Sequence, residues 1–219
     1  MSPPRRREGT ARGEPPPRVL IDRESLARHV ERIAGEITAD HPERVVLVGV
    51  LKGALIFLAD LARAITDVDV TVDFLAISRY APDSGRVRIL KDLEVDVEGR
   101  DVVIVEDLVD TGLTIAYLLS HVQERAPRSL DVCTLLDRPE RRIVPQTVRY
   151  VGQQIDDVFV LGYGLHYADL YRNVPYIVEV DRRVVLERPE AYVDALYAGE
   201  SETIGGSQRS LHSGRPVVD

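Results

Sequence analysis

The sequence predicts an α/β protein with a mainly parallel central sheet and helices on both faces of that sheet. Continuous Val, Ile and Leu runs of strand length recur along the chain, and segments with helical spacing of apolar residues separate them. Strands that are apolar throughout are buried on both faces, as in a parallel sheet. The chain has 219 residues, of which 44% are hydrophobic, and this fits one domain better than two.

Each predicted element follows from its local pattern. In the first helix, apolar residues from Leu26 to Ile37 recur at helical spacing, and Asp22 can cap the first turn. The predicted helices cover residues 22–41, 53–65 and 114–126. The predicted strands cover residues 44–50, 68–77, 86–93, 101–106, 129–136, 148–152, 157–161 and 174–180, with 86–93 at a margin of the sheet.

The two ends of the chain differ from its middle. Residues 1–18 are rich in Pro, Arg and Gly, and residues 199–219 are rich in Gly and Ser. Neither end has enough apolar residues to bury, so we expect both to be disordered tails. Residues 19–198 form the expected domain, without a repeat or an internal linker.

Charge and composition exclude several classes of partner. Lys and Arg total 28 against 36 Asp and Glu, which argues against a broad nucleic-acid surface, so no nucleic acid is expected. No apolar run approaches 18 residues and the N-terminus lacks an apolar signal segment, so we expect no membrane and a cytoplasmic protein. The single cysteine, Cys133, lies in an apolar run and is expected to be buried and unreactive.

The predicted central strand ends at two acids, Glu106 and Asp107, and a small polar loop follows. Ligands of parallel sheets bind beyond the carboxyl ends of the strands. In the loop, Gly112 between Thr111 and Thr114 can expose successive N–H groups at a helix start, which suits a phosphate. The spacing of an ATPase P-loop is absent. The acids could bind sugar hydroxyls or a metal ion, or they could simply cap the helix, and the residues alone leave both open.

The complete motif is more specific. An apolar strand, two acids, two apolar residues and then Asp-Thr-Gly-x-Thr resemble the phosphoribosyl-pyrophosphate motif of the type I phosphoribosyltransferases. Further blocks resemble the hypoxanthine-guanine phosphoribosyltransferases in order: "VLKGALIFLADLARAI", "CTLLDRPERR" and "YVGQQIDDVFVLGYGLHYADLYRNVPYI". The resemblance covers about Val45 to Val180. It implies a type I fold with a small hood region, and transfer of phosphoribose from phosphoribosyl pyrophosphate to N9 of a 6-oxopurine, giving IMP or GMP and pyrophosphate.

The resemblance also implies a role for each matching residue. Glu106 and Asp107 would bind the ribose hydroxyls, directly or through Mg²⁺. Asp110 would be the acid or base near N7 of the purine, unless it only holds the loop. The 5′-phosphate would be bound by the loop residues Asp110, Thr111, Gly112, Leu113 and Thr114.

The leaving group and the base have their own matching residues. Lys52 and Gly53 match the loop that meets pyrophosphate, which often carries a cis peptide bond before the lysine, and Arg172 matches a second pyrophosphate contact. Phe159 would stack on the purine, although a strand residue could equally be ordinary core. The carbonyl of Val160 would face the amino group of the base.

Some positions depart from the family pattern. Residues 77–86 match a mobile lid in which Tyr80 would exclude water, but Arg79 precedes it where serine is usual. Arg138 replaces the lysine that donates to the 6-oxo group, and its planar fork is expected to affect base selectivity. Gln153 replaces a phenylalanine, which is expected to affect packing.

The most consequential departure is His166, which stands where an aspartate helps to bind Mg²⁺. An imidazole is a poor ligand for this hard cation, whereas a protonated imidazole could meet pyrophosphate directly. Asp169 could compensate in part. Two alternatives therefore remain: a paralogue acting on a modified purine such as a 7-deazapurine, and a catalytically impaired regulator that senses phosphoribosyl pyrophosphate. The resemblance also implies a homodimer or homotetramer.

Overall fold

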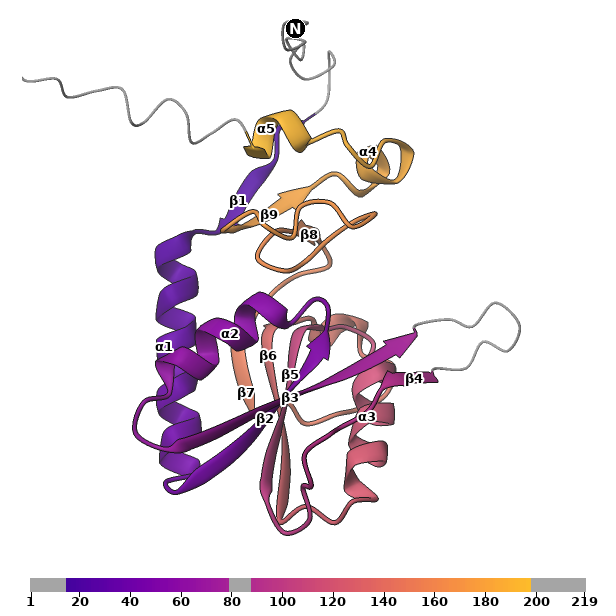
Figure 1. The fold of residues 1–219 in the computed structure, drawn as a ribbon. Helices are drawn as coiled ribbons and strands as arrows, with labels where there is room; N and C mark the ends of the chain where they lie inside the picture. The colour runs from indigo at the N-terminus through magenta and orange to yellow at the C-terminus, as the bar shows by residue number, and fades with distance from the viewer. Residues whose placement is uncertain (1–14, 79–87, 198–219) are drawn as a thin grey trace, which may run out of the picture.

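A six-stranded sheet forms the centre of the computed structural model, which describes residues 15–78 and 88–197 (Figure 1). Its strand order is β4-β3-β2-β5-β6-β7. The strands are β2 (Arg44–Leu51), β3 (Asp69–Ser78), β4 (Arg88–Lys91), β5 (Asp101–Val109), β6 (Ser129–Asp137) and β7 (Tyr150–Gln154). Only β4 runs antiparallel to its neighbour, and it lies at the margin as expected. The predicted mainly parallel sheet is confirmed.

Helices cover both faces of this sheet, as predicted. The three long helices are α1 (Arg23–Asp40), α2 (Leu55–Ala64) and α3 (Leu113–Gln123). Successive residues of a strand point to opposite faces. Val45 and Leu47 of β2 therefore join the core with α1 and α2, and Val46 and Val48 join the core with α3. The carboxylate of Asp22 caps α1 as expected, because it accepts a hydrogen bond of 2.7 Å from the Ser25 amide.

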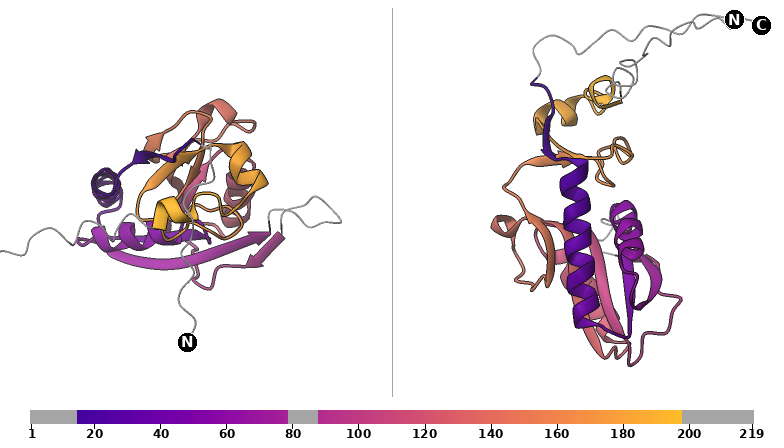
Figure 2. Two further views of the ribbon diagram at one scale, coloured as in Figure 1. Left: turned by 90° about the horizontal axis from the view of Figure 1, so that it is seen from above. Right: turned by 90° about the vertical axis from the view of Figure 1, so that its left-hand side faces the viewer.

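A second, three-stranded antiparallel sheet forms a hood at one end of the main sheet (Figure 1). It consists of β1 (Arg18–Ile21), β9 (Ile177–Val180) and β8 (Phe159–Leu161), followed by the short helices α4 (Arg182–Glu187) and α5 (Val193–Tyr197). In the right-hand view of Figure 2, α1 runs along the main sheet and its N-terminal end reaches the hood. Strand β1 was not predicted from the sequence, and Arg18 was assigned to the N-terminal tail. In the structure, Arg18 pairs with Glu179 of β9 and binds its carboxylate.

Strand β5 is longer than predicted. It continues through Glu106 and Asp107 to Val109, where it still pairs with Asp137 of β6. The two acidic side chains are 4% and 6% exposed. The predicted strand, 101–106, therefore ends three residues too early, and Asp107 belongs to the strand as Glu106 does. The Asp107 carboxylate accepts a hydrogen bond of 2.8 Å from the amide of Leu108, and buried carboxylates require such partners.

Two smaller expectations can be compared with the structure. Cys133 is fully buried in the core, and burial raises the pKa of its thiol. Among the helices of residues 15–78 and 88–197, none is both long and apolar enough to cross a membrane.

Candidate active site

The predicted phosphate loop connects β5 to the start of α3. Gly112 has a φ of +82°, and a Cβ at this position would lie 2.4 Å from the carbonyl oxygen of Val144, so only glycine fits. The Thr111 carbonyl accepts hydrogen bonds from the amides of Ile143 (2.9 Å) and Val144 (3.0 Å). These contacts fix the loop at the N-terminus of α3, whose first N–H groups have no partner within the helix and favour an anion.

Three segments that are distant in sequence meet beside this loop. Gly53 follows β2, and a Cβ there would lie only 1.8 Å from Oδ2 of Asp107 on β5. Gly164 of the hood has a φ of +99°, and a Cβ there would lie 2.2 Å from the carbonyl oxygen of Gly53. The Gly53 loop is therefore enclosed between the Asp107 carboxylate and the hood. The peptide bond between Leu51 and Lys52 is cis, as the resemblance implied.

Basic side chains gather around one exposed carboxylate at the hood edge of this site. The nearest distances from Asp169 Oδ1 are 3.2 Å to Arg172 Nη2, 3.7 Å to Lys52 Nζ and 3.9 Å to His166 Nδ1. The hydrogen bond from Arg172, followed by the charge of Lys52, lowers the pKa of Asp169. Arg172 also donates to the carbonyl of Gly164 at 2.7 Å. The structure thus brings Lys52, Arg172 and His166 together around one carboxylate, and their role in binding pyrophosphate stays a prediction.

A hydrogen bond defines the tautomer of His166. The backbone amide of Asp169 donates to His166 Nδ1 over 3.1 Å. Since Nδ1 is the acceptor, the proton of the neutral imidazole is on Nε2. His166 can therefore act as a donor to an anion through Nε2 without being protonated.

Asp110 lies directly after β5 and faces two arginines. Arg138 Nη1 is 3.5 Å from one carboxylate oxygen of Asp110, and Arg141 Nε is 3.3 Å from the other. Arg138 is only 5% exposed, and it donates to the carbonyls of Asp156 (3.2 Å) and Val158 (2.5 Å). Burial lowers the pKa of Arg138, an effect that the charge of Asp110 opposes. Arg141 was not predicted as a site residue, because it is one of several arginines in a polar segment.

The residues expected to contact the base lie on or near β8. Phe159 is half-buried, and its ring makes an edge contact with Tyr167, with centroids 6.0 Å apart. Val160 is buried and pairs with Glu179 of β9.

At another position that departs from the family pattern, Gln153 connects β7 to α1 through a contact of 3.1 Å with His29 Nε2. The lid residues Arg79 and Tyr80 lie outside the described part of the chain.

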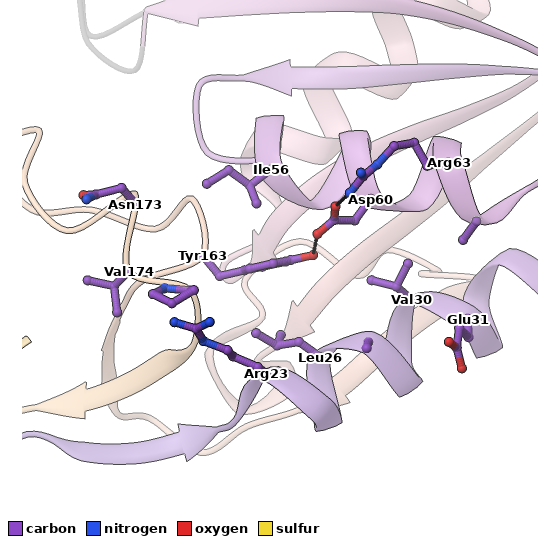
Figure 3. A pocket seen from close by; sticks show the side chains of 13 residues that line it. Arg23, Leu26, Val30, Glu31, Ile56, Asp60, Arg63, Tyr163, Asn173 and Val174 are labelled. Carbon is purple, nitrogen blue, oxygen red and sulfur yellow. Dashed lines mark hydrogen bonds and ion pairs between the residues drawn. The ribbon is translucent and has the colours of Figure 1, made fainter. Parts of the chain in front are cut away.

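A cavity of about 530 Å³ lies elsewhere, between α1, α2 and the segment 163–175 (Figure 3). None of the predicted site residues lines it. In Figure 3 the hydroxyl of Tyr163 donates to the Asp60 carboxylate, which joins the hood to α2, and burial raises the pKa of that hydroxyl. The cavity is therefore a hollow at the junction of hood and core.

Carboxylates are the groups here that suit a metal ion. Glu106 and Asp107 offer oxygen atoms, which Mg²⁺ prefers, whereas His166 offers nitrogen. Within residues 15–78 and 88–197, no group of three or more His, Cys, Asp or Glu is arranged to hold a metal ion. This arrangement fits Mg²⁺ bound through one or two carboxylates together with substrate oxygens, and not a site made by the protein alone.

Comparisons with known proteins identify the family of the chain. A family model described as the phosphoribosyl transferase domain matches residues 20–168. The chain is 43% identical over 164 residues to the hypoxanthine-guanine phosphoribosyltransferase of Bacillus subtilis (strain 168). The aligned region covers 73% of this chain and 91% of that protein. It is 45% identical over 176 residues to the enzyme of the same name from Mycobacterium avium, over 76% of this chain and 86% of that protein.

A solved structure gives the same result. The crystal structure of a hypoxanthine-guanine phosphoribosyltransferase from Bacillus anthracis superposes with a TM-score of 0.71 at 45% identity, and the match covers 75% of this chain and 98% of that chain. The chain belongs to the hypoxanthine-guanine phosphoribosyltransferase family.

Proposed function

We propose that this protein transfers the 5-phosphoribosyl group from phosphoribosyl pyrophosphate to N9 of hypoxanthine or guanine, forming IMP or GMP and pyrophosphate in purine salvage. One observation carries the proposal: the Gly112 loop at the start of α3 directly adjoins the two buried carboxylates of β5. A phosphate site beside a carboxylate pair is complementary to a sugar phosphate. The relatives named above support the same reaction.

The donor binds along the ends of β5 and β2. The backbone N–H groups at the start of α3 and the hydroxyls of Thr111 and Thr114 hold the 5′-phosphate. Leu113 is 53% exposed and contributes through its backbone. Glu106 and Asp107 bind the ribose hydroxyls and would hold Mg²⁺, which when bound neutralises charge on the pyrophosphate.

Pyrophosphate leaves toward the cluster of basic side chains at the hood edge. Lys52 and Arg172 offer positive charge, His166 offers its Nε2–H, and Gly53 allows the close approach of backbone. Asp169 now pairs with Arg172 and lies 3.7 Å from Lys52, so its carboxylate must turn aside when the anion arrives. Donors that are already in position stabilise charge as it develops on the leaving oxygen.

The base binds against β8. Phe159 stacks on the purine, the carbonyl of Val160 faces an exocyclic amine, and Arg138 donates to the 6-oxo group. The lone pair of N9 forms the bond to C1 of the ribose as the C1–O bond to pyrophosphate breaks. The N7 proton then passes to the Asp110 carboxylate, a transfer that typically contributes about 10²–10⁴-fold. The role proposed for Tyr80 is to exclude water from the reacting groups.

The proposal also includes a setting for the reaction. We place it in the cytoplasm, carried out by a homodimer or homotetramer, with Mg²⁺ as the only cofactor and no nucleic-acid partner. Light scattering of the purified protein would measure the assembly state directly. The two terminal segments, with Arg18 excepted because it belongs to β1, are proposed as tails outside the transferase domain.

Steady-state pyrophosphate release tests the reaction. The purified protein would receive phosphoribosyl pyrophosphate and Mg²⁺ with hypoxanthine, guanine, xanthine, adenine or 7-deazaguanine, and a chelator control would test the metal requirement. We expect turnover with hypoxanthine or guanine and far less with adenine. Turnover of 7-deazaguanine alone would contradict the proposal, and so would the absence of turnover with all of these bases.

A further inference from the structure

Two arginines contact the carboxylate of Asp110 on opposite sides. Arg138 faces Oδ2 at 3.5 Å, and Arg141 Nε faces Oδ1 at 3.3 Å. Both arginines come from the segment directly after β6, whose last residue pairs with the end of β5. The backbone of this segment is fixed as well, because the Arg138 amide donates to the Val109 carbonyl at 3.0 Å.

The same two arginines hold the segment that leads into β8. Arg138 binds the carbonyls of Asp156 and Val158, and Arg141 Nη1 binds the Asp157 carboxylate at 3.1 Å. Phe159 follows at the start of β8. Arg141 therefore connects the carboxylate of Asp110 to the strand on which the base would stack.

The Oδ1 atom of Asp110 is buried, and it accepts no hydrogen bond from the described residues. Arg141 Nε lies within ion-pair distance of this atom, but not in the geometry of a hydrogen bond. A buried carboxylate oxygen that keeps a lone pair open requires an explanation. The nearby charge of Arg141 supplies that explanation. Because Oδ1 is buried while the side chain of Asp110 is 30% exposed, a substrate N–H can reach this carboxylate at Oδ2 and not at Oδ1.

We propose that Arg141 is a positioning residue, which holds Oδ1 of Asp110 so that Oδ2 faces the N7–H of a purine stacked on Phe159, with Asp157 as its second anchor. This inference rests on the proposed function. Arg141 does not touch the substrate. It acts by keeping the end of β5 and the start of β8 in fixed positions relative to each other.

A simpler interpretation is that Arg141 makes ordinary surface ion pairs, since its side chain is 35% exposed and that of Asp157 is 60% exposed. Such pairs contribute little to folding stability. The two interpretations predict different effects. A surface pair affects neither kcat nor KM, whereas a positioning residue affects kcat while leaving the KM for phosphoribosyl pyrophosphate unchanged.

The test compares Arg141→Gln with Arg149→Gln. Arg149 is a matched control, because it also bridges two aspartates, Asp40 (2.9 Å) and Asp131 (3.4 Å), but at the opposite end of the sheet strands. We expect Arg141→Gln to lower kcat for hypoxanthine by roughly tenfold, a fraction of the proton-transfer contribution, with little change in the KM for phosphoribosyl pyrophosphate. Arg149→Gln should match the wild type.

A double-mutant cycle distinguishes the loss of this specific contact from nonspecific effects of each substitution on the enzyme. Asp157→Asn should lower kcat in the wild-type background and add little once Arg141→Gln is present, because both act through the same contact. Equal kcat in Arg141→Gln and the wild type would overturn the inference, and so would fully additive losses in the cycle. A wild type that turns over no base would instead refute the proposed function, and the inference would fall with it.

Discussion

Replacing Gly53 by alanine is expected to disable the site through one specific contact. The added Cβ would lie 1.8 Å from Oδ2 of Asp107 and 2.5 Å from its Cγ. Ordinary van der Waals contact begins at 3.4 Å, so the two groups must separate by 3.4 − 1.8 = 1.6 Å. Asp107 is buried and the Gly53 carbonyl lies against Gly164, so neither side can move freely.

The size of this displacement gives the expected loss. A misplacement of about 1 Å in an active site can cost on the order of 100-fold in rate, so we expect kcat/KM for hypoxanthine to fall by about that factor or more. Overpacking of this kind also costs roughly 1–3 kcal/mol of folding stability. For a chain of this size, each kcal/mol corresponds to about 2–4 °C in Tm.

Gly35→Ala is the matched control. A Cβ on Gly35, within α1, would have nothing within 4 Å. Alanine favours a helix over glycine by about 1 kcal/mol, so Tm should rise by about 2–4 °C. Its kcat/KM should not change. Steady-state kinetics and thermal unfolding of both variants check this, and a Gly53→Ala enzyme within threefold of the wild-type kcat/KM would refute the reasoning.

Three further predictions concern the metal, the base and the pH dependence of stability. His166→Asp should lower the Mg²⁺ concentration for half-maximal activity by roughly tenfold, because a carboxylate replaces a poor ligand, and a Mg²⁺ titration of the rate measures this. Arg138→Met removes a donor to the base and should raise the KM for hypoxanthine by roughly tenfold, with the KM for phosphoribosyl pyrophosphate unchanged, in initial-rate kinetics. The pKa of Asp101 is lowered, chiefly by its hydrogen bond from Arg128, so Asp101 contributes stability above its unfolded pKa of about 3.9 that is lost as pH falls. Asp101→Asn should therefore cost about 1–3 kcal/mol in urea unfolding at pH 7, and less at pH 3.

The main sheet could be predicted because its strands are uniform apolar runs. In β2 and β6 the local pattern alone predicts burial on both faces, and the structure agrees. Strand β1 could not be found in this way. It has four residues, follows a proline-rich segment, and forms by pairing with β9 at the other end of the domain. The strand forms because of this long-range pairing, and no short stretch of the sequence contains both partners.

The backbone of the proposed phosphate loop was predictable because one short motif contains it. The left-handed Gly112 at the start of α3 is an example, because its neighbours in sequence are also its neighbours in the loop. The contact between Gly53 and Asp107 joins the loop after β2 to strand β5. The contacts of Arg141 with Asp110 and Asp157 join three segments. These relations depend on how the strands align, and a lone arginine in a polar stretch gives no signal of them.

The most direct measurement of the central claim is the identity of the product. Purified wild-type protein would be incubated with hypoxanthine, phosphoribosyl pyrophosphate and Mg²⁺, and the mixture analysed by mass spectrometry alongside a pyrophosphate assay. The account predicts IMP, substituted at N9, and pyrophosphate in equal amounts, with GMP formed when guanine is the acceptor. Pyrophosphate or nucleotide formation from 7-deazaguanine only, or no nucleotide from hypoxanthine or guanine, would contradict it.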